Sequence, residues 1–153
     1  MIEDLLRVAD GLAKKKKPTE AALRRATSSA YYAAFHALCE TVAGSMCSDP
    51  SSRLYDRLYR MVEHRHLDEG VNHFYFSDVT RKIRLQLDNL RQKRIEADYA
   101  PRQFPYSSRE VVEFVTEAAN VINALRGLET ADREELAANL LSRVSEKSRA
   151  KKD

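Results

Sequence analysis

The sequence predicts an all-α protein, an antiparallel bundle of helices. Glycine and proline supply only four residues each of the 153, which leaves few of the turns that a β-sandwich needs. Apolar residues instead recur at intervals of three and four along most of the chain, as they do on one face of an α-helix. Short connections between such segments favour antiparallel neighbours. A hydrophobic content of 43% suffices for one core.

Residues 1–17 are predicted to form an N-terminal helix followed by a lysine-rich hinge. Apolar residues lie at helical spacing from Ile2 to about Ala13, and residues 14–17 are all lysine. Cations suit the C-terminal end of a helix, where unpaired carbonyls leave partial negative charge, and Pro18 suits the first turn of the next helix. We interpret the lysine run as a solvated hinge, because one run of this length binds little by itself.

Residues 18–128 are predicted to form the helical bundle itself. The first of its helices, at about residues 19–43, carries a stripe of small residues that lets a neighbouring helix approach closely: Ala22, Ala26, Ala30, Ala33 and Ala37. A loop is expected at residues 41–52. Asp49-Pro50 or Ser52 can then cap a further helix, which is expected to end near residues 64–66.

The next helix, which Asp78 is expected to cap, has a strong excess of positive charge. The net charge of the whole chain is only +3. Between positions 81 and 94, however, Asp88 is the single acidic residue against six basic ones: Arg81, Lys82, Arg84, Arg91, Lys93 and Arg94. Positive charge concentrated on one helix is typical of a surface that attracts phosphate.

The C-terminal third of the chain is predicted to contain two more helices. Ser107 and Glu110 have the spacing of a capping box, in which the two side chains satisfy each other's backbone amides. The helix that they open is expected to stop around Gly127. Thr130 can cap the last helix, so residues 129–153 are assigned to a C-terminal helix and a basic tail.

The chain lacks the sequence patterns of several enzyme and membrane classes. It has neither a Gly-x-Ser-x-Gly elbow nor a glycine-rich phosphate loop, and its four histidines are not at metal-ligand spacing from carboxylates. We therefore expect no metal and no cofactor. Cys39 and Cys47 fit no redox pattern and are expected to be reduced and structural. Without a signal-peptide pattern or a long apolar run, a cytoplasmic location with no membrane partner is expected.

Two clusters of residues could bind a ligand, and the first lies on the helix at residues 19–43. Tyr32 and His36 are four residues apart and Arg25 precedes Tyr32 by seven, so all three share one helical face. Such a polar stripe can contact a ligand directly. It can equally form a buried hydrogen-bond network that closes the bundle.

The second cluster ends the basic helix and comprises Arg91, Arg94, Asp98 and Tyr99. Arg94 and Asp98 have the spacing of an i,i+4 ion pair, and Tyr99 lies where the helix must end before Pro101. Taken alone, these residues indicate a structural helix terminus, locked by the ion pair and a packed tyrosine.

Together the two clusters resemble the HEPN domain family, specifically its bacterial members with an AYYxxFH helix and a later RxxADYxP segment. Here the motifs are AYYAAFH at residues 30–36 and RIEADYAP at residues 94–101, and the similarity spans about residues 21–128. The resemblance implies an up-and-down antiparallel four-helix bundle (HEPN-like) with additional N- and C-terminal helices, which forms a homodimer. It also implies one of three activities: metal-independent endoribonuclease toxin, RNA or nucleotide binding, or partnership with a minimal nucleotidyltransferase.

The sequence departs from the catalytic HEPN motif, in which a histidine follows the arginine. Tyr99 stands five positions after Arg94, and a tyrosine is a poor general base at neutral pH. Arg57 with His64 and Arg60 with His66 also fit the loose Arg-x4–6-His spacing, but they lie on a different helix from the second motif and are discounted.

Three hypotheses follow from the resemblance. In the first, a homodimeric module of a bacterial toxin–antitoxin or defence system binds RNA or nucleotide through Arg91, Lys93 and Arg94. In the second, a ribonuclease toxin uses Arg94 and Tyr99 as catalytic residues, supported by His36 or Asp98. In the third, the domain is the protein partner of a nucleotidyltransferase.

Overall fold

Residues 1–62 and 77–150 are described in the computed structural model, with side chains described as far as residue 141. These residues form helices and connecting loops without a strand, which confirms the all-α prediction. The helices, in chain order, are α1 (Ile2–Ala13), α2 (Glu20–Met46), α3 (Arg53–Met61), α4 (Asp78–Tyr99), α5 (Ser108–Arg126) and α6 (Thr130–Ala150). None of the described helices combines the length and the apolar character needed to cross a bilayer.

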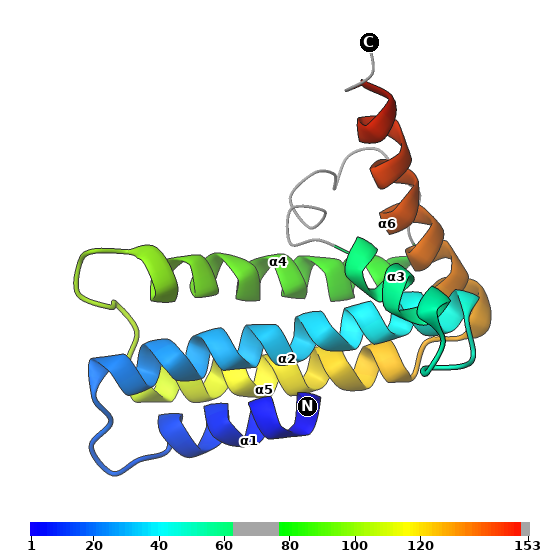
Figure 1. Ribbon diagram of the computed structural model, residues 1–153. Coiled ribbons are helices and arrows are strands. Elements are labelled where there is room, and N and C mark those ends of the chain that lie inside the picture. The colour runs from blue at the N-terminus through cyan, green and yellow to red at the C-terminus, as the bar shows by residue number, and fades with distance from the viewer. Residues whose placement is uncertain (63–76, 151–153) are drawn as a thin grey trace.

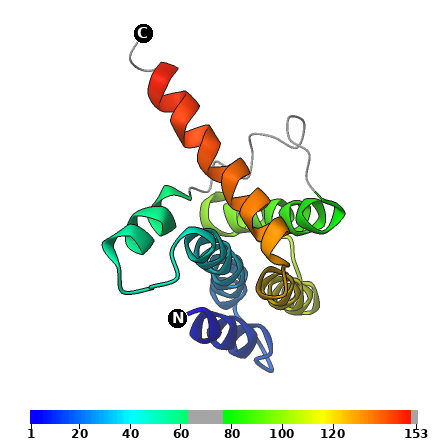
Figure 2. The same ribbon diagram turned by 90° about the vertical axis from the view of Figure 1, so that its right-hand side faces the viewer.

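Four of the helices lie side by side and alternate in direction along the chain. Figure 1 shows α1 and α4 running opposite to α2 and α5, while α6 leaves the end of the bundle at a steep angle. The view along the bundle shows α2 in the middle, and α2 packs against each of the other five helices (Figure 2). The AYYAAFH motif on α2 is therefore carried by the most enclosed element of the fold.

The centre of the bundle is filled by the small-residue stripe of α2, as the sequence predicts. Ala26, Ala30, Ala33 and Ala37 are all buried, and Tyr31 is fully buried among them. One hydrophobic core joins these residues to buried side chains of α1 and of α6. The division of the chain at residues 17 and 128 stays a prediction, although the core extends through both positions.

Most helix starts match the sequence prediction, but two caps differ. Thr130, expected to cap the last helix, is the first residue of α6. Ser107 and Glu110 form the complete capping box, and Ser52 caps α3. The cap of α4, however, is Ser77 and not Asp78, because the Ser77 Oγ accepts a hydrogen bond from the Thr80 amide at 3.3 Å. Asp78 lies in the first turn, where a negative charge suits the helix dipole.

Three boundaries differ from the sequence prediction. Pro18 precedes the N-cap residue Thr19 and so lies just outside α2. The C-terminal end of α2 is Met46, three residues beyond the expected position, since Gly44 is tolerated in a helix although it is a poor helix former. Helix α3 ends at Met61, earlier than the expected end near residues 64–66, which lies outside the described residues together with His73.

Candidate functional site

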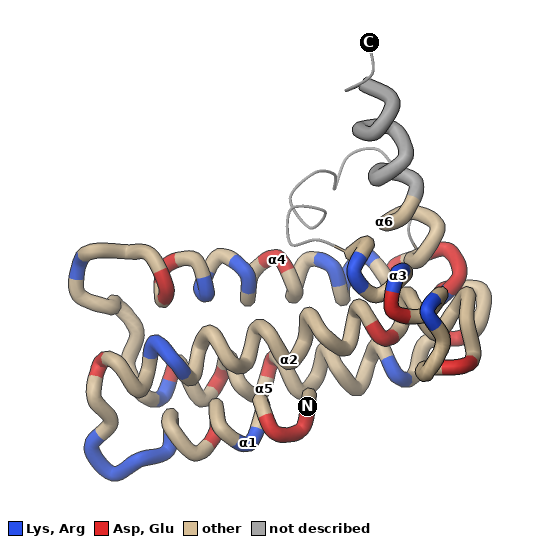
Figure 3. Tube along the Cα trace, viewed as in Figure 1, with Lys and Arg blue, Asp and Glu red and all other residues tan. Residues whose placement is uncertain are grey.

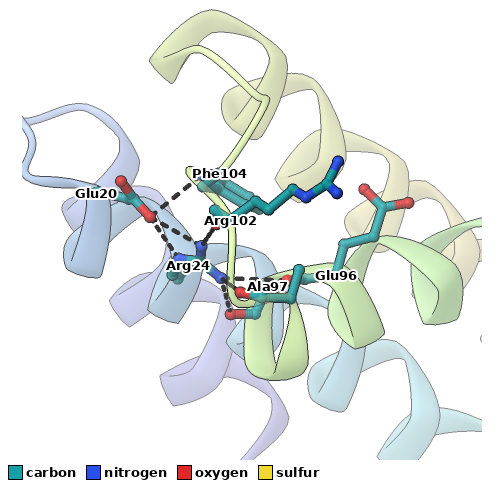
Figure 4. Close-up of polar contacts among 7 residues, drawn as sticks. Glu20, Arg24, Glu96, Ala97, Arg102 and Phe104 are labelled. Atoms are coloured by element: carbon teal, nitrogen blue, oxygen red, sulfur yellow. Dashed lines mark hydrogen bonds and ion pairs between the residues drawn. The ribbon is translucent and has the colours of Figure 1, made fainter.

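The C-terminal end of α4 is held in place by Arg24 of α2, as Figure 4 shows. Nη1 of Arg24 donates to the carbonyl oxygens of Ala97 at 2.9 Å, Glu96 at 3.2 Å and Ala100 at 3.3 Å. Its Nη2 donates to the carbonyl of Arg102 at 2.6 Å. The last carbonyls of a helix have no partner within the helix, so a guanidinium that binds several of them fixes where the helix ends.

Two further contacts keep Arg24 itself in position. Glu20, one turn earlier on α2, forms an ion pair with it at 2.8 Å and also accepts a hydrogen bond from the Phe104 amide at 3.2 Å. The guanidinium of Arg24 lies 5.3 Å from the centre of the Phe104 ring. The end of α4 and the turn after it are thereby tied to α2, and this anchoring positions Arg94, Asp98 and Tyr99.

Arg94 is enclosed by three tyrosine rings. Only 7% of the residue is exposed. Its guanidinium carbon lies 5.2 Å from the ring centre of Tyr31, 5.7 Å from that of Tyr32 and 5.9 Å from that of Tyr99. Such cation–π contacts stabilise a guanidinium more strongly when water is excluded. The two sequence clusters therefore meet at this residue, which brings Tyr32 of the first beside Arg94 of the second.

The charge of Arg94 is only loosely balanced. Asp98 is its carboxylate partner, with 3.9 Å between Nη1 and Oδ2, and that Oδ2 also accepts a hydrogen bond from Ser28 at 3.1 Å. The Nε atom of Arg94 is buried and has no hydrogen-bond partner among the residues that the structure describes. A buried guanidinium with one distant counter-ion produces a positive potential in its surroundings.

Tyr99 and Tyr31 lie at opposite extremes of exposure around this arginine. Tyr99 is 71% exposed, so its ring contacts Arg94 on one side and solvent on the other. Burial raises the pKa of Tyr31 above its usual range, although the nearby Arg94 charge acts in the opposite direction. Tyr31 is therefore a neutral part of the core, whereas Tyr99 is accessible to a ligand.

The other two residues of the first cluster do not join Arg94. His36 is hydrogen-bonded through Nδ1 to the hydroxyl of Tyr59 on α3, and the two rings are stacked with their centres 5.9 Å apart. Burial lowers the pKa of His36, which favours the neutral imidazole. Arg25 is exposed. The polar stripe thus divides: Tyr32 faces α4, His36 faces α3, and Arg25 faces solvent.

The basic residues of α4 lie mostly inside the fold. Arg84 is 5% exposed, and 11% of the Arg91 side chain is exposed, with Asp88 3.7 Å away. Nζ of Lys93 lies within 5 Å of the ring centres of Tyr106 and Phe114, at 4.8 and 4.6 Å. Of the six basic residues, Arg81 and Lys82 are exposed. The expected phosphate-attracting surface along this helix is therefore small.

Two hollows in the described part of the molecule lie away from Arg94. One, of about 240 Å³, is lined by residues of α2, α5 and α6 that include Glu40, Thr41 and Arg133. The other, of about 270 Å³, lies against α3. Within the described residues, no three histidine, cysteine or carboxylate side chains gather in a way that could hold a metal ion.

The two cysteines are free thiols, as the sequence predicts. Cys39 is buried in α2, and burial raises its pKa to about 12. Cys47 is partly exposed, and its Sγ lies 3.0 Å from the hydroxyl oxygen of Ser52. A thiol with a raised pKa is unreactive near neutral pH, which leaves Cys39 a packing role.

Comparison with known proteins identifies no relative of this chain. No family model matches the chain, and neither a curated protein nor a solved structure matches it. The resemblance to the HEPN family therefore rests on the two sequence motifs alone.

Proposed function

We propose that this protein is a homodimeric RNA- or nucleotide-binding module of a bacterial toxin–antitoxin or defence system, and that its ligand contacts Arg94 and Tyr99. The observation that carries the proposal is the pairing of an exposed tyrosine ring with a buried, loosely compensated arginine. The dimer and the biological setting rest on the resemblance of the two motifs to the HEPN family.

The two side chains would bind different parts of one nucleotide. An exposed aromatic ring offers a flat surface on which a base can stack, whatever the sequence of the nucleic acid. The positive potential around Arg94 favours a phosphate nearby, because Asp98 is a single carboxylate at 3.9 Å. Asp98 also limits that attraction, so we expect moderate affinity that falls as salt is added.

The test is a titration of a fluorescent single-stranded RNA with wild type, Tyr99→Ala and Tyr99→Phe. Loss of one base–aromatic stack is worth about 1–3 kcal/mol, so Tyr99→Ala should weaken binding roughly 5- to 150-fold while Tyr99→Phe binds as wild type. Leu85→Ala is the matched control, because Leu85 is an exposed side chain of the same helix. Equal affinity of Tyr99→Ala and wild type, or no binding at all, contradicts the proposal.

A second candidate function, metal-independent RNA cleavage, is favoured by the contact of the exposed Tyr99 with Arg94. In that case the phenol hydroxyl would take part in the reaction, while Arg94 would stabilise charge on the phosphate. Tyr99→Phe separates the two functions, since it keeps the ring and removes the hydroxyl. Cleavage in the presence of a chelator that Tyr99→Phe abolishes would establish catalysis. RNA that stays intact with wild-type protein would leave binding as the function.

A further inference from the structure

Helix α3 presents a row of arginines to solvent. Arg53, Arg57 and Arg60 follow one another at intervals of four and three residues, so they lie along one face of the helix, and all three are exposed. At 1.5 Å per residue they are about 6 and 4.5 Å apart along the axis. None of them forms an ion pair within the described part of the chain.

The opposite side of α3 holds it on the bundle. Leu58 is 6% exposed and Val62, which follows the last turn, is 5% exposed, and α3 packs against α2. Tyr59 adds the hydrogen bond to His36. The Ser52 side chain caps the first turn by accepting a hydrogen bond from the Tyr55 amide at 3.1 Å. The arginines therefore project from a helix that is fixed at its start and along its inner face.

The arginine face is hollowed and remains net positive. The hollow of about 270 Å³ against α3 is lined, among the described residues, by Arg53, Asp56, Arg57 and Arg60. Three guanidinium groups and one carboxylate give this set a net charge of +2. Guanidinium groups present paired N–H donors that match the oxygens of a phosphate. Tyr55, two residues from both Arg53 and Arg57, lies on the other side of the helix, where its ring centre is 6.4 Å from that of Tyr59.

We propose that this arginine face of α3 binds the sugar-phosphate backbone of single-stranded RNA, an inference that rests on the proposed function. Its position relative to the Arg94 site supports one continuous ligand. Tyr32 of α2 contacts Arg94, and His36, one turn or about 6 Å further along α2, contacts Tyr59 of α3. A strand whose base stacks on Tyr99 can follow α2 toward α3 and must then pass over that helix to reach the arginines on its outer face.

The character of α3 favours RNA over a lipid surface. A helix that lies on a membrane inserts its apolar face between the lipids. The apolar residues Leu58 and Val62 are instead buried, and Leu54, at 52% exposure, is the large apolar side chain of α3 that faces solvent. Exposed guanidinium groups on a helix whose apolar face is already buried suit a phosphate backbone better than a lipid surface.

The experiment compares two triple variants that each remove three positive charges. One is Arg53→Gln/Arg57→Gln/Arg60→Gln. The matched control is Lys15→Gln/Lys16→Gln/Lys17→Gln, which changes three exposed lysines in the loop between α1 and α2. Binding of a single-stranded RNA of about 12 nucleotides is measured at several salt concentrations. If the arginines contact three phosphates, the slope of log K against log salt should become shallower by about 2, whereas the lysine variant should keep the wild-type slope.

Three further measurements decide between the alternatives. Binding of a mononucleotide should be unchanged by the arginine variant, because that ligand needs only the Tyr99 site. Circular dichroism should show the same helix content in both triple variants. Binding to vesicles that contain phosphatidylserine should be weak and equal for wild type and both variants, and stronger binding that only the arginine variant loses would assign the face to lipid.

The outcomes separate this inference from the function on which it rests. An unchanged salt slope in the arginine variant, with Tyr99→Ala still impaired, overturns the α3 surface and leaves the proposed function intact. Equal changes in the two triple variants show a non-specific effect of net charge and also overturn it. A wild-type protein that binds neither RNA nor mononucleotide overturns both.

Discussion

Helices α4 and α3 both carry rows of arginines, but most of those on α4 face the bundle interior and those on α3 face solvent. Figure 3 shows Lys and Arg residues along both helices. Arg84 and Arg94 of α4 are buried, whereas Arg53, Arg57 and Arg60 of α3 are exposed. The number of charges on a helix is therefore a poor guide to the field that it presents to a ligand. What decides is the register of the arginines relative to the apolar stripe, because residues three or four apart share a face.

We therefore expect the two rows of arginines to have different roles, a structural role on α4 and a binding role on α3. Arg94 of α4 is enclosed by tyrosine rings, so its removal should weaken the fold. The exposed arginines of α3 have no ion-pair partner in the described part of the chain, so their removal should affect only the binding of a charged ligand. Variants that change one arginine of each kind test this division directly.

The largest effect is expected at Arg24, the inward-facing arginine of α2. Arg24→Ala removes four hydrogen bonds to carbonyls and the ion pair with Glu20, and it should lower the free energy of unfolding by about 3 kcal/mol. The adjacent Arg25 is exposed, and Arg25→Ala should change it by less than about 0.5 kcal/mol. Urea unfolding measures both. Similar decreases in unfolding free energy for Arg24→Ala and Arg25→Ala would contradict the distinction between inward- and outward-facing arginines.

A smaller loss is expected from Arg94→Ala. The variant gives up contacts with Tyr31, Tyr32 and Tyr99 but leaves Asp98 near the surface, so we expect a decrease in unfolding free energy of about 2 kcal/mol. Arg57→Ala on α3 is the matched control, with an expected change within about 0.5 kcal/mol. Unfolding curves of the two variants in urea compare the helices directly, and a destabilised Arg57→Ala would show that α3 also uses its arginines structurally.

The local part of this arrangement could be predicted from the sequence. The Arg94–Asp98 pair and the Ser107–Glu110 capping box depend on residues three or four apart, and both are present. The sequence also encodes the inward register of α4. Arg84, Arg91 and Arg94 lie three, four and seven residues from the core residue Leu87, so they share its face of the helix. The number of basic residues on the helix does not show which face they occupy, so the charge count alone suggests an exposed basic surface.

The role of Arg24 could not be predicted in the same way. Its partners are backbone carbonyls 72 to 78 residues further along the chain, and a carbonyl has no sequence signature. The sequence indicates that α4 needs a partner at its C-terminal end, since Pro101 stops it, but any basic side chain could supply it. The contact between His36 and Tyr59 is equally non-local, because it depends on how α3 packs against α2.

The smallest effect concerns the hydrogen bond between His36 and Tyr59, which connects the outward arginine helix to the bundle. Burial lowers the pKa of His36 in the folded protein, and the nearby amino terminus acts in the same direction. The unfolded chain, with an ordinary histidine pKa near 6.5, then binds more protons than the folded one as the pH falls. The stability that the neutral imidazole provides is thus complete above about pH 6.5 and is lost as the pH falls through the lowered folded pKa.

This dependence should be confined to the attachment of α3. We expect the urea midpoint of wild type to decrease between pH 7.5 and pH 5.5 by more than that of His36→Gln, in which nothing titrates at this position. Tyr59→Phe serves as a second variant, because it removes the hydroxyl that contacts Nδ1 and keeps the stacked ring. If wild type and His36→Gln respond alike, the histidine does not govern how firmly α3 is attached. The position of the arginine face would then rest on contacts that do not titrate, such as the burial of Leu58 and Val62.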